Sequence, residues 1–162
     1  MKNKTLHIVR HGKALQDYSY IQDDDRPLVE KGIINNIVVA KKFITLYSVP
    51  ELIISSYAAR ALQTAHIFAR TMNYPHNKII ACEELYLRGD KETYDILVNL
   101  NDVVRSVMVV GHNPDLIFLA NRFAARINDL STSSVVTISF ETKRWIDIEK
   151  VKTKCSVLGK DS

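Results

Sequence analysis

The side chains best suited to chemistry in this sequence are two histidines and two arginines that stand close to apolar runs. Arg10 and His11 directly follow one such run, His112 follows a second, and Arg60 lies in a helical pattern just after a third. A guanidinium beside buried apolar residues is costly unless a carboxylate or a phosphate pairs with it, and Arg10 is in that position. This combination of side chains is suited to binding an oxyanion, and phosphate best.

The apolar runs are predicted to be strands of a largely parallel sheet. They are rich in β-branched residues and lie at 5–9, 52–54, 106–110 and 135–140. A further strand at 145–148 is expected to pair antiparallel with 135–140 through a turn at 141–144. The tail after about residue 152 is expected to fray.

Segments with helical periodicity separate these strands. They cover about 30–46, 58–72, 91–100 and 113–124, the last with Asn113 as N-cap and Pro114 at the first helical position. On the first helix we expect one broad buried face, made of Ile33, Ile34, Ile37, Val38, Ala40, Phe43 and Ile44. The alternation predicts an α/β fold, a three-layer α/β/α sandwich with a mostly parallel central sheet.

The carboxyl ends of the predicted strands bring the four chemical side chains to one rim of the sheet, where ligands bind in such folds. Helix N-termini at that rim add N–H groups and partial positive charge, and Gly12 would let the backbone turn closely around a ligand. Each residue alone has a structural alternative. Arg10 could form an internal ion pair, His11 could be a buried structural histidine, and His112 could help to cap a helix. Their joint arrival at three strand ends favours a phosphate site.

Metal catalysis and two common phosphate or hydrolase motifs fit the sequence poorly. His7 and His11 are four residues apart, but a strand would separate them by about 13 Å, whereas a zinc pair at that spacing needs a helix. His112 and Asp115 could supply two ligands, with no evident third. Neither a P-loop nor a Gly-x-Ser-x-Gly elbow is present. We therefore expect no metal and no cofactor.

Composition limits the class of partner. The 162 residues contain 22 lysines and arginines against 18 aspartates and glutamates, and these bases are scattered rather than clustered in runs with aromatics. The longest apolar runs have four or five residues, and no signal peptide opens the chain. Cys82 and Cys155 do not form a disulfide framework or a metal-spaced pair. We expect a cytoplasmic protein that binds neither nucleic acid nor membrane.

Four motifs, in order along the chain, resemble those of the histidine phosphatase (phosphoglycerate mutase-like) superfamily. They are Arg10-His11-Gly12, Arg26-Pro27-Leu28 with Gly32, Ser56-Tyr57-Ala58-Ala59-Arg60-Ala61-Leu62-Gln63-Thr64-Ala65, and Gly111-His112-Asn113-Pro114. Within the superfamily, the short chain is similar to the SixA-like phosphohistidine phosphatases. The resemblance implies a phosphoglycerate mutase-like fold, with residues 1–162 as a single histidine phosphatase domain.

The resemblance also implies roles for the residues at the rim. It implies a metal-independent phosphatase in which neutral His11 attacks phosphorus and forms a phosphohistidine intermediate that water then hydrolyses. In this scheme Arg10 and Arg60 clamp the phosphoryl oxygens, His112 donates a further hydrogen bond, and Arg26 and Gly12 border the substrate. One departure concerns the first long helix, because Val29 stands where the family usually has a capping Thr.

The general acid is the least marked part of the site. Glu84 and Glu83 are the main candidates, and Asp90 and Asp17 are further ones, although each is also a typical surface acid. Phosphohistidine needs less help than an ester, because the leaving imidazole takes up a proton easily near neutral pH. A weakly marked acid is therefore compatible with a phosphohistidine substrate.

Three functions remain open at this point. The first is removal of phosphate from phosphohistidine in a signalling or phosphotransfer protein, the second is hydrolysis of a small phosphorylated molecule, and the third is a non-enzymatic phosphate-binding scaffold. Only about 50 residues separate Arg60 from His112, which leaves little chain for a lid. An uncovered site favours the protein-borne phosphohistidine.

Overall fold

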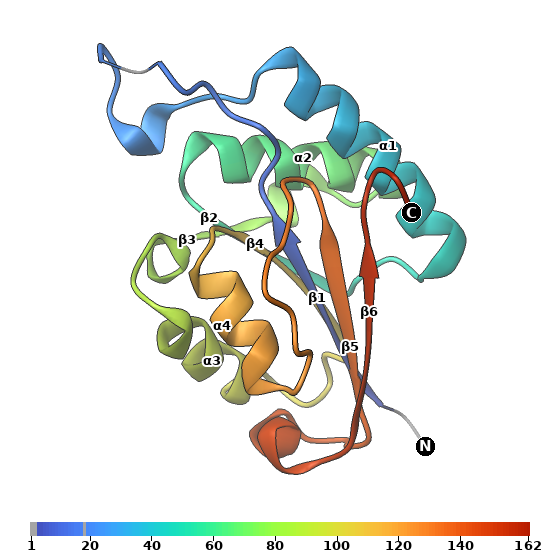
Figure 1. The fold of residues 1–162 in the computed structure, drawn as a ribbon. Coiled ribbons are helices and arrows are strands. Elements are labelled where there is room, and N and C mark those ends of the chain that lie inside the picture. The colour runs from blue at the N-terminus through green and yellow to red at the C-terminus, as the bar shows by residue number, and fades with distance from the viewer. Residues whose placement is uncertain (1–2, 18) are drawn as a thin grey trace.

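A six-stranded mixed sheet forms the centre of the computed structural model, which describes residues 3–17 and 19–162 (Figure 1). Its strands are β1 (Lys4–Arg10), β2 (Leu52–Ser56), β3 (Ile80–Cys82), β4 (Ser106–Gly111), β5 (Val135–Phe140) and β6 (Thr153–Leu158). They lie in the order β3-β2-β4-β1-β5-β6. The first four of that order are mutually parallel, and β5 is antiparallel to both β1 and β6.

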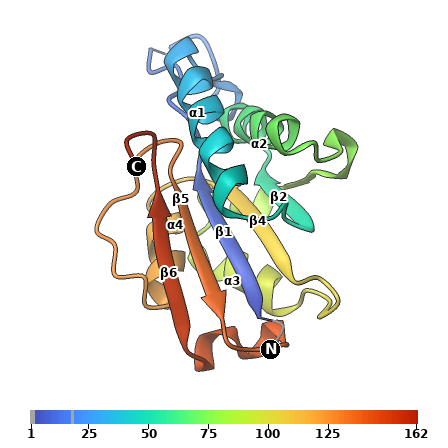
Figure 2. The same cartoon turned by 90° about the vertical axis from the view of Figure 1, so that its right-hand side faces the viewer.

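Helices cover both faces of the sheet, which confirms the three-layer α/β/α prediction (Figures 1 and 2). One face carries α1 (Glu30–Leu46) and α2 (Ala59–Met72), and the other carries α3 (Asp90–Val98) and α4 (Asp115–Arg122). Four 3₁₀ helices connect them: η1 (Asp23–Asp25), η2 (His76–Lys78), η3 (Glu83–Leu85) and η4 (Trp145–Lys150). Alternate residues of β1 feed two separate cores, with Leu6 and Ile8 on the α4 face and Val9 on the α1 face.

The predicted hairpin exists, but its second strand is wrong. Residues 145–148, expected as a strand, begin the 3₁₀ helix η4, and the tail expected to fray after residue 152 forms β6, which pairs with β5 along its whole length. Trp145 and Ile148 are both fully buried, and a spacing of three residues places both on one side of a 3₁₀ helix. The need to bury this pair therefore outweighs the strand-like alternation of the segment.

The buried face of α1 also differs from the prediction. Ile33, Ile34, Ile37, Val38 and Ile44 are exposed, whereas Gly32, Asn36, Val39, Ala40 and Phe43 are buried. A Cβ at Gly32 would lie 2.2 Å from the carbonyl oxygen of Lys13, so the helix meets the chain after β1 through its glycine. The rotation of the helix about its axis is therefore set by this close approach and by the buried Asn36. Its largest aliphatic residues do not set it.

The start of α4 differs from the expected cap. The Asn113–Pro114 peptide is cis, Pro114 rather than Asn113 is the N-cap residue, and the Asn113 side chain donates to the Leu130 carbonyl at 2.9 Å. Strand β3, at the sheet edge, has only three residues and was not foreseen. Among the described residues, no helix is both long and apolar enough to cross a bilayer.

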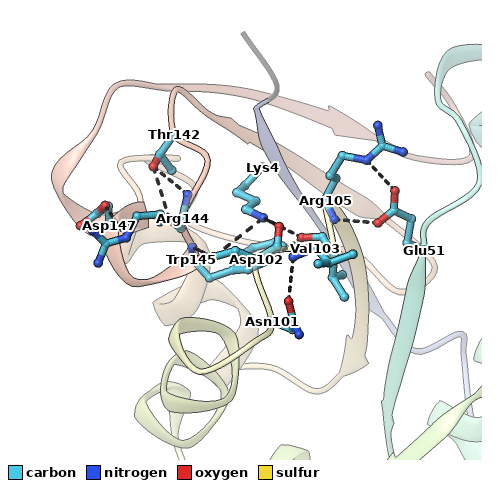
Figure 3. Close-up of polar contacts among 11 residues, drawn as sticks. Lys4, Glu51, Asn101, Asp102, Val103, Arg105, Thr142, Arg144, Trp145 and Asp147 are labelled. Carbon is cyan, nitrogen blue, oxygen red and sulfur yellow. Dashed lines mark hydrogen bonds and ion pairs between the residues drawn. The ribbon is translucent and has the colours of Figure 1, made fainter.

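The amino end of β1 is anchored by a buried lysine (Figure 3). Lys4 is 1% exposed, and its Nζ donates to the carbonyl oxygens of Asp102 and Val104 at 2.6 and 2.8 Å. The Trp145 indole donates to the same Val104 oxygen at 2.8 Å. These contacts join β1, the loop before β4 and η4 at the end of the sheet opposite the carboxyl ends of the parallel strands.

Candidate active site

A cavity of about 380 Å³ opens beyond the carboxyl ends of β1 and β4 and beside the start of α2. Its lining residues are Arg10, His11, Lys13, Ala14, Gln16, Asp23, Arg26, Arg60, Leu87, His112, Asn113 and Thr132. The structure thus brings together five of the residues singled out in the sequence: Arg10, His11, Arg26, Arg60 and His112. Parallel pairing of Arg10 with Gly111 at the ends of β1 and β4 places His11 and His112 side by side, with ring centroids 5.1 Å apart.

His11 is held as a neutral imidazole with a free Nε2. Its Nδ1 lies 2.7 Å from the carbonyl oxygen of Gly12, which can only accept, so the proton is on Nδ1 and the lone pair is on Nε2. Burial lowers the pKa of His11 to about 4, and the nearby Arg60 and Arg10 act in the same direction against the Gly12 hydrogen bond. At neutral pH this imidazole therefore has an unprotonated nitrogen, the form in which a histidine can act as a nucleophile.

His112 is also neutral but has a different partner. Burial, followed by His11 and Arg60, lowers its pKa to about 3. Its Nε2 lies 2.8 Å from the Ser56 hydroxyl, and Ser56 Oγ already accepts the Ala58 N–H at 3.2 Å. The Ser56 hydroxyl also has a proton of its own, and when it donates this proton to His112 Nε2 the His112 proton lies on Nδ1.

Three buried nitrogens around the cavity have no hydrogen-bond partner in the described part of the chain. They are Nε of Arg10, Nε of Arg60 and Nδ1 of His112. Buried donors are normally satisfied, and a group of orphaned ones indicates a missing partner. All three residues line the same cavity, so one acceptor with several oxygens would satisfy them together.

Asp23 lines the cavity as well and is bound to both flanking arginines. One of its carboxylate oxygens lies 2.9 Å from Arg26 Nη2, and the other lies 3.1 Å from Arg60 Nη2 and accepts the Tyr86 hydroxyl. Burial favours the neutral acid, but the Tyr86 hydrogen bond and the two arginines outweigh it and lower the pKa of Asp23 to about 2. This carboxylate is therefore ionised at any physiological pH.

Residues 6–87 match the family profile of the histidine phosphatase superfamily (branch 1). The chain belongs to this superfamily. An uncharacterized protein of Picosynechococcus sp. (strain PCC 7002) is 33% identical over 113 residues, which are 68% of this chain and 67% of that protein. The resemblance stated from the four sequence motifs is thereby confirmed.

Two solved structures are similar to this histidine phosphatase across most of its length. One, from Agrobacterium tumefaciens and assigned as the phosphohistidine phosphatase SixA, is 30% identical with a TM-score of 0.75, covering 85% of this chain and 92% of that chain. Another, assigned as SixA of Nakamurella multipartitia, has a TM-score of 0.82 at 20% identity and covers 98% of this chain and 96% of that chain. The second likeness shows the fold alone, and both agree with the expected phosphoglycerate mutase-like architecture.

The expected acids are not part of the cavity of this histidine phosphatase. Glu84 accepts a hydrogen bond from Cys82 Sγ at 2.8 Å, and Glu83 forms an exposed ion pair with Arg88 at 3.4 Å. Asp90 pairs with Arg122 at 2.8 Å on the α3–α4 side. Glu83 and Glu84 belong to the short η3 helix and do not line the cavity, whereas Asp23 is the carboxylate that does.

Gly12 packs closely against the neighbouring helices, and its substrate contact stays a prediction. It does not line the cavity; a Cβ there would lie 2.7 Å from Asn36 Nδ2 and 3.0 Å from the Gly32 carbonyl oxygen. Its N–H donates to Thr64 Oγ1 at 3.0 Å, and its carbonyl orients His11. The glycine thus lets β1 end against α1 and α2, which sets the position of the histidine.

Sequence reasoning assigned no role to several residues at or beside the cavity, above all Asp23, Tyr86 and Ser56. Tyr86 packs its ring edge-on to His112 with centroids 5.3 Å apart. A signal for Asp23 did exist, since an acid three residues before Arg26 in a short helical turn can pair with it, as the 2.9 Å contact shows. Nothing in the local sequence could connect Asp23 to Arg60, because the two residues are 37 positions apart.

A larger cavity of about 610 Å³ lies at the opposite end of the sheet, around the residues of Figure 3. Its charged side chains are largely paired with one another, Lys4 with Asp102 and Arg105 with Glu51. It contains no histidine and, unlike the first cavity, no orphaned buried nitrogen among the described residues. Within the same residues, no group of three or more His, Cys, Asp or Glu side chains is arranged to hold a metal ion.

Proposed function

We propose that this histidine phosphatase removes the phosphoryl group from phosphohistidine carried by a signalling or phosphotransfer protein. The observation that carries the proposal is the state of Asp23, the one carboxylate among the described residues that line the cavity. It is ionised and already bound by Arg26, Arg60 and Tyr86, so it has no proton to give to a leaving group. The reaction that suits this site is one whose leaving group needs no strong acid.

The first half of the reaction uses His11 as nucleophile. Its Nε2 lone pair attacks phosphorus, a new N–P bond forms, and the P–N bond to the substrate imidazole breaks. Because the pKa of an imidazole ring lies close to 7, the phosphorylated ring of the substrate can already carry a proton on its other nitrogen, so it leaves as neutral imidazole and needs no proton from an enzyme acid. An alkoxide leaving group would instead need a positioned acid in the transition state.

The second half releases the phosphoryl group to water. Water attacks the phosphorus of phospho-His11, the N–P bond breaks, and the electron pair returns to Nε2, while the proton lost by water goes to the phosphate product or to solvent. Throughout, the guanidinium groups of Arg10 and Arg60 and the Nδ1–H of His112 stabilise the charge on the phosphoryl oxygens. The three orphaned nitrogens support these assignments, because each then has its acceptor.

Access to the cavity supports a protein-borne phosphoryl group. Of the residues between Arg60 and His112, Leu87 alone lines the cavity in the described structure. That stretch of chain is taken up by α2, β3, α3 and β4 rather than by a cover over the site. The 30% identical relative of Agrobacterium tumefaciens, assigned as a phosphohistidine phosphatase, points to the same substrate class.

The direct test is replacement of the nucleophile. His11→Ala should abolish turnover of a phosphohistidine protein and should leave no acid-labile phosphate on the enzyme, whereas the wild type is transiently phosphorylated on His11. His66→Ala changes an exposed histidine of α2 and should retain full activity, which controls for histidine content. Phosphate transfer to protein is followed with a radiolabelled phosphohistidine substrate under acid and neutral quench.

A substrate panel separates the remaining functions. Values of kcat/KM on the phosphohistidine protein should exceed those on small phosphate esters, since the site offers them no acid. Faster turnover of one ester would replace the proposal with a small-molecule phosphomonoesterase. Tight phosphate binding without hydrolysis of any substrate would identify a scaffold module instead.

A further inference from the structure

The carboxylate of Asp23 binds two of the three arginines that line the cavity, Arg26 and Arg60, as a bound anion would. Arg26 approaches one oxygen through Nε at 3.0 Å and Nη2 at 2.9 Å, and Arg60 approaches the other through Nη2 at 3.1 Å. Tyr86 donates its hydroxyl to the same oxygen as Arg60. The two guanidinium groups around these oxygens are donors that a phosphoryl group would also use.

The position of Asp23 allows its carboxylate to leave without unfolding the loop. Its side chain is 36% exposed, whereas that of Arg60 is 3% exposed and that of Arg26 is 16% exposed. The backbone carbonyl of Asp23 separately accepts Arg60 Nη1 at 2.6 Å. The short helix η1 can therefore stay docked on Arg60 through its backbone while the side chain turns toward solvent.

We propose that Asp23 is an internal counter-anion of the phosphate site, which holds Arg26 and Arg60 in the empty cavity and competes with the phosphoryl group for them. The inference rests on the proposed function only in naming the phosphoryl group as the competitor. Asp23 does not touch the reacting atoms, so it is a positioning residue. Because its pKa is about 2, the competition operates over the whole physiological pH range.

A competing carboxylate and a purely structural ion pair predict opposite changes in phosphate affinity when Asp23 is replaced. Phosphate and an ionised carboxylate repel each other in a partly desolvated site, so the carboxylate weakens phosphate binding and speeds the departure of the product. A residue that merely orients the two arginines would do the opposite, because its loss would let the donors move and would weaken binding.

The test measures binding of inorganic phosphate, and of tungstate as its analogue, to the full chain by titration calorimetry. Asp23→Asn keeps the size of the side chain and removes its charge, and it should lower the Kd for phosphate about tenfold. Inhibition of turnover by inorganic phosphate should strengthen by the same factor. Weaker binding by Asp23→Asn, or binding equal to that of wild type, overturns the proposal.

Asp25→Asn is the matched control. It removes the same charge from the same short helix, but Asp25 is exposed, and within the described chain its carboxylate has no hydrogen bond or ion pair. Its Kd for phosphate should stay within about twofold of wild type, as expected for a solvated charge. Equal tightening in both variants would mean that net charge alone acts, and this too would overturn the proposal.

A milder variant covers the case in which Asp23→Asn does not fold. Tyr86→Phe keeps the ring against His112 and removes only the hydroxyl that Asp23 accepts, so it should lower the Kd in the same direction by a smaller factor. An unchanged or raised Kd contradicts the competition. Binding needs no turnover, so a chain that fails to hydrolyse phosphohistidine still decides the role of Asp23, and failure of either proposal is seen separately.

Discussion

Two buried histidines of the same site obtain different proton positions from their immediate neighbours. A carbonyl fixes the proton of His11 on Nδ1 and leaves Nε2 free, whereas His112 meets the Ser56 hydroxyl at Nε2 and has its own proton on Nδ1 when that hydroxyl donates. Both are neutral, with pKa values of about 4 and about 3, lowered first of all by burial. The first is thereby suited to attack and the second to donate, although the residue type is the same.

The assignment of His112 as a donor makes Ser56 a positioning residue. Ser56→Ala should lower kcat for the phosphohistidine protein about tenfold, because loss of one buried hydrogen bond leaves the tautomer of His112 unspecified. The nitrogen chemical shifts of His112 should change from the Nδ1–H form to a mixture of tautomers in NMR spectra. Ser106→Ala, at the far end of β4, is the control and should leave both unchanged. A fully active Ser56→Ala protein with an unaltered His112 tautomer would contradict the assignment.

Single site residues could be placed from the sequence where they directly follow a predicted strand. Arg10, His11 and His112 could be placed because their neighbours in sequence define β1 and β4. Asp23 could not be placed, since its contact with Arg60 depends on how the short helix η1 packs against α2. The acids next to β3 were more conspicuous in sequence but lie outside the cavity.

Elements were predictable where local pattern and tertiary packing agree. The bounds of α1 and β5 match the expected ranges, because periodicity and flanking turns both indicate them. Of the buried face predicted for α1, Ala40 and Phe43 are buried as expected, but its isoleucines are exposed. Gly32, Asn36 and Val39 are buried instead. The strand predicted for 145–148 was wrong, because Trp145 is buried against Val104 and a 3₁₀ helix buries it together with Ile148.

One weak point of α1 can be corrected from sequence and structure together. Val29 is its N-cap residue, with φ −86° and ψ 165°, and makes no side-chain cap hydrogen bond. Val29→Thr has nearly the same shape and supplies an oxygen for the free N–H groups of the first turn, so it should stabilise the fold by about 0.5–1 kcal/mol. Urea denaturation measures the change. Val29→Ala, which offers no acceptor, should not stabilise, and an equal gain there would exclude capping as the cause.

For the whole molecule, the net charge of +4 tells less about how stability depends on pH than the buried neutral imidazoles do. Burial lowers the pKa values of His7 and His11 to about 4 and of His112 to about 3, all below the ordinary value of 6.5. His7 packs between the ring of Phe43 and Thr137 in the α1 core, far from any proposed chemistry. The same burial that keeps His11 reactive thus creates a general sensitivity to acid.

The sign of this sensitivity follows from linkage. Between pH 6.5 and about 4 the unfolded chain binds protons at these histidines and the folded chain does not, so stability is complete above pH 6.5 and falls as the pH drops toward 4. At pH 5 each fully buried histidine costs up to roughly 2 kcal/mol, and His11, which is partly exposed, costs less. The free energy of unfolding from urea titrations should therefore drop by several kcal/mol between pH 7.5 and pH 5.

Replacing one of these histidines separates their contribution from that of other titrating groups. His7→Asn retains a side chain that can bond Thr137 but cannot take up a proton, so its stability at pH 7.5 is expected to be lower while the loss on going to pH 5 is smaller than in wild type. The difference between the two proteins in the free energy of unfolding lost from pH 7.5 to pH 5 gives the contribution of His7 directly. A variant whose stability falls as steeply with acid as that of wild type would show that His7 is not held neutral in the folded protein, and the same argument for His11 and His112 would then lose its basis.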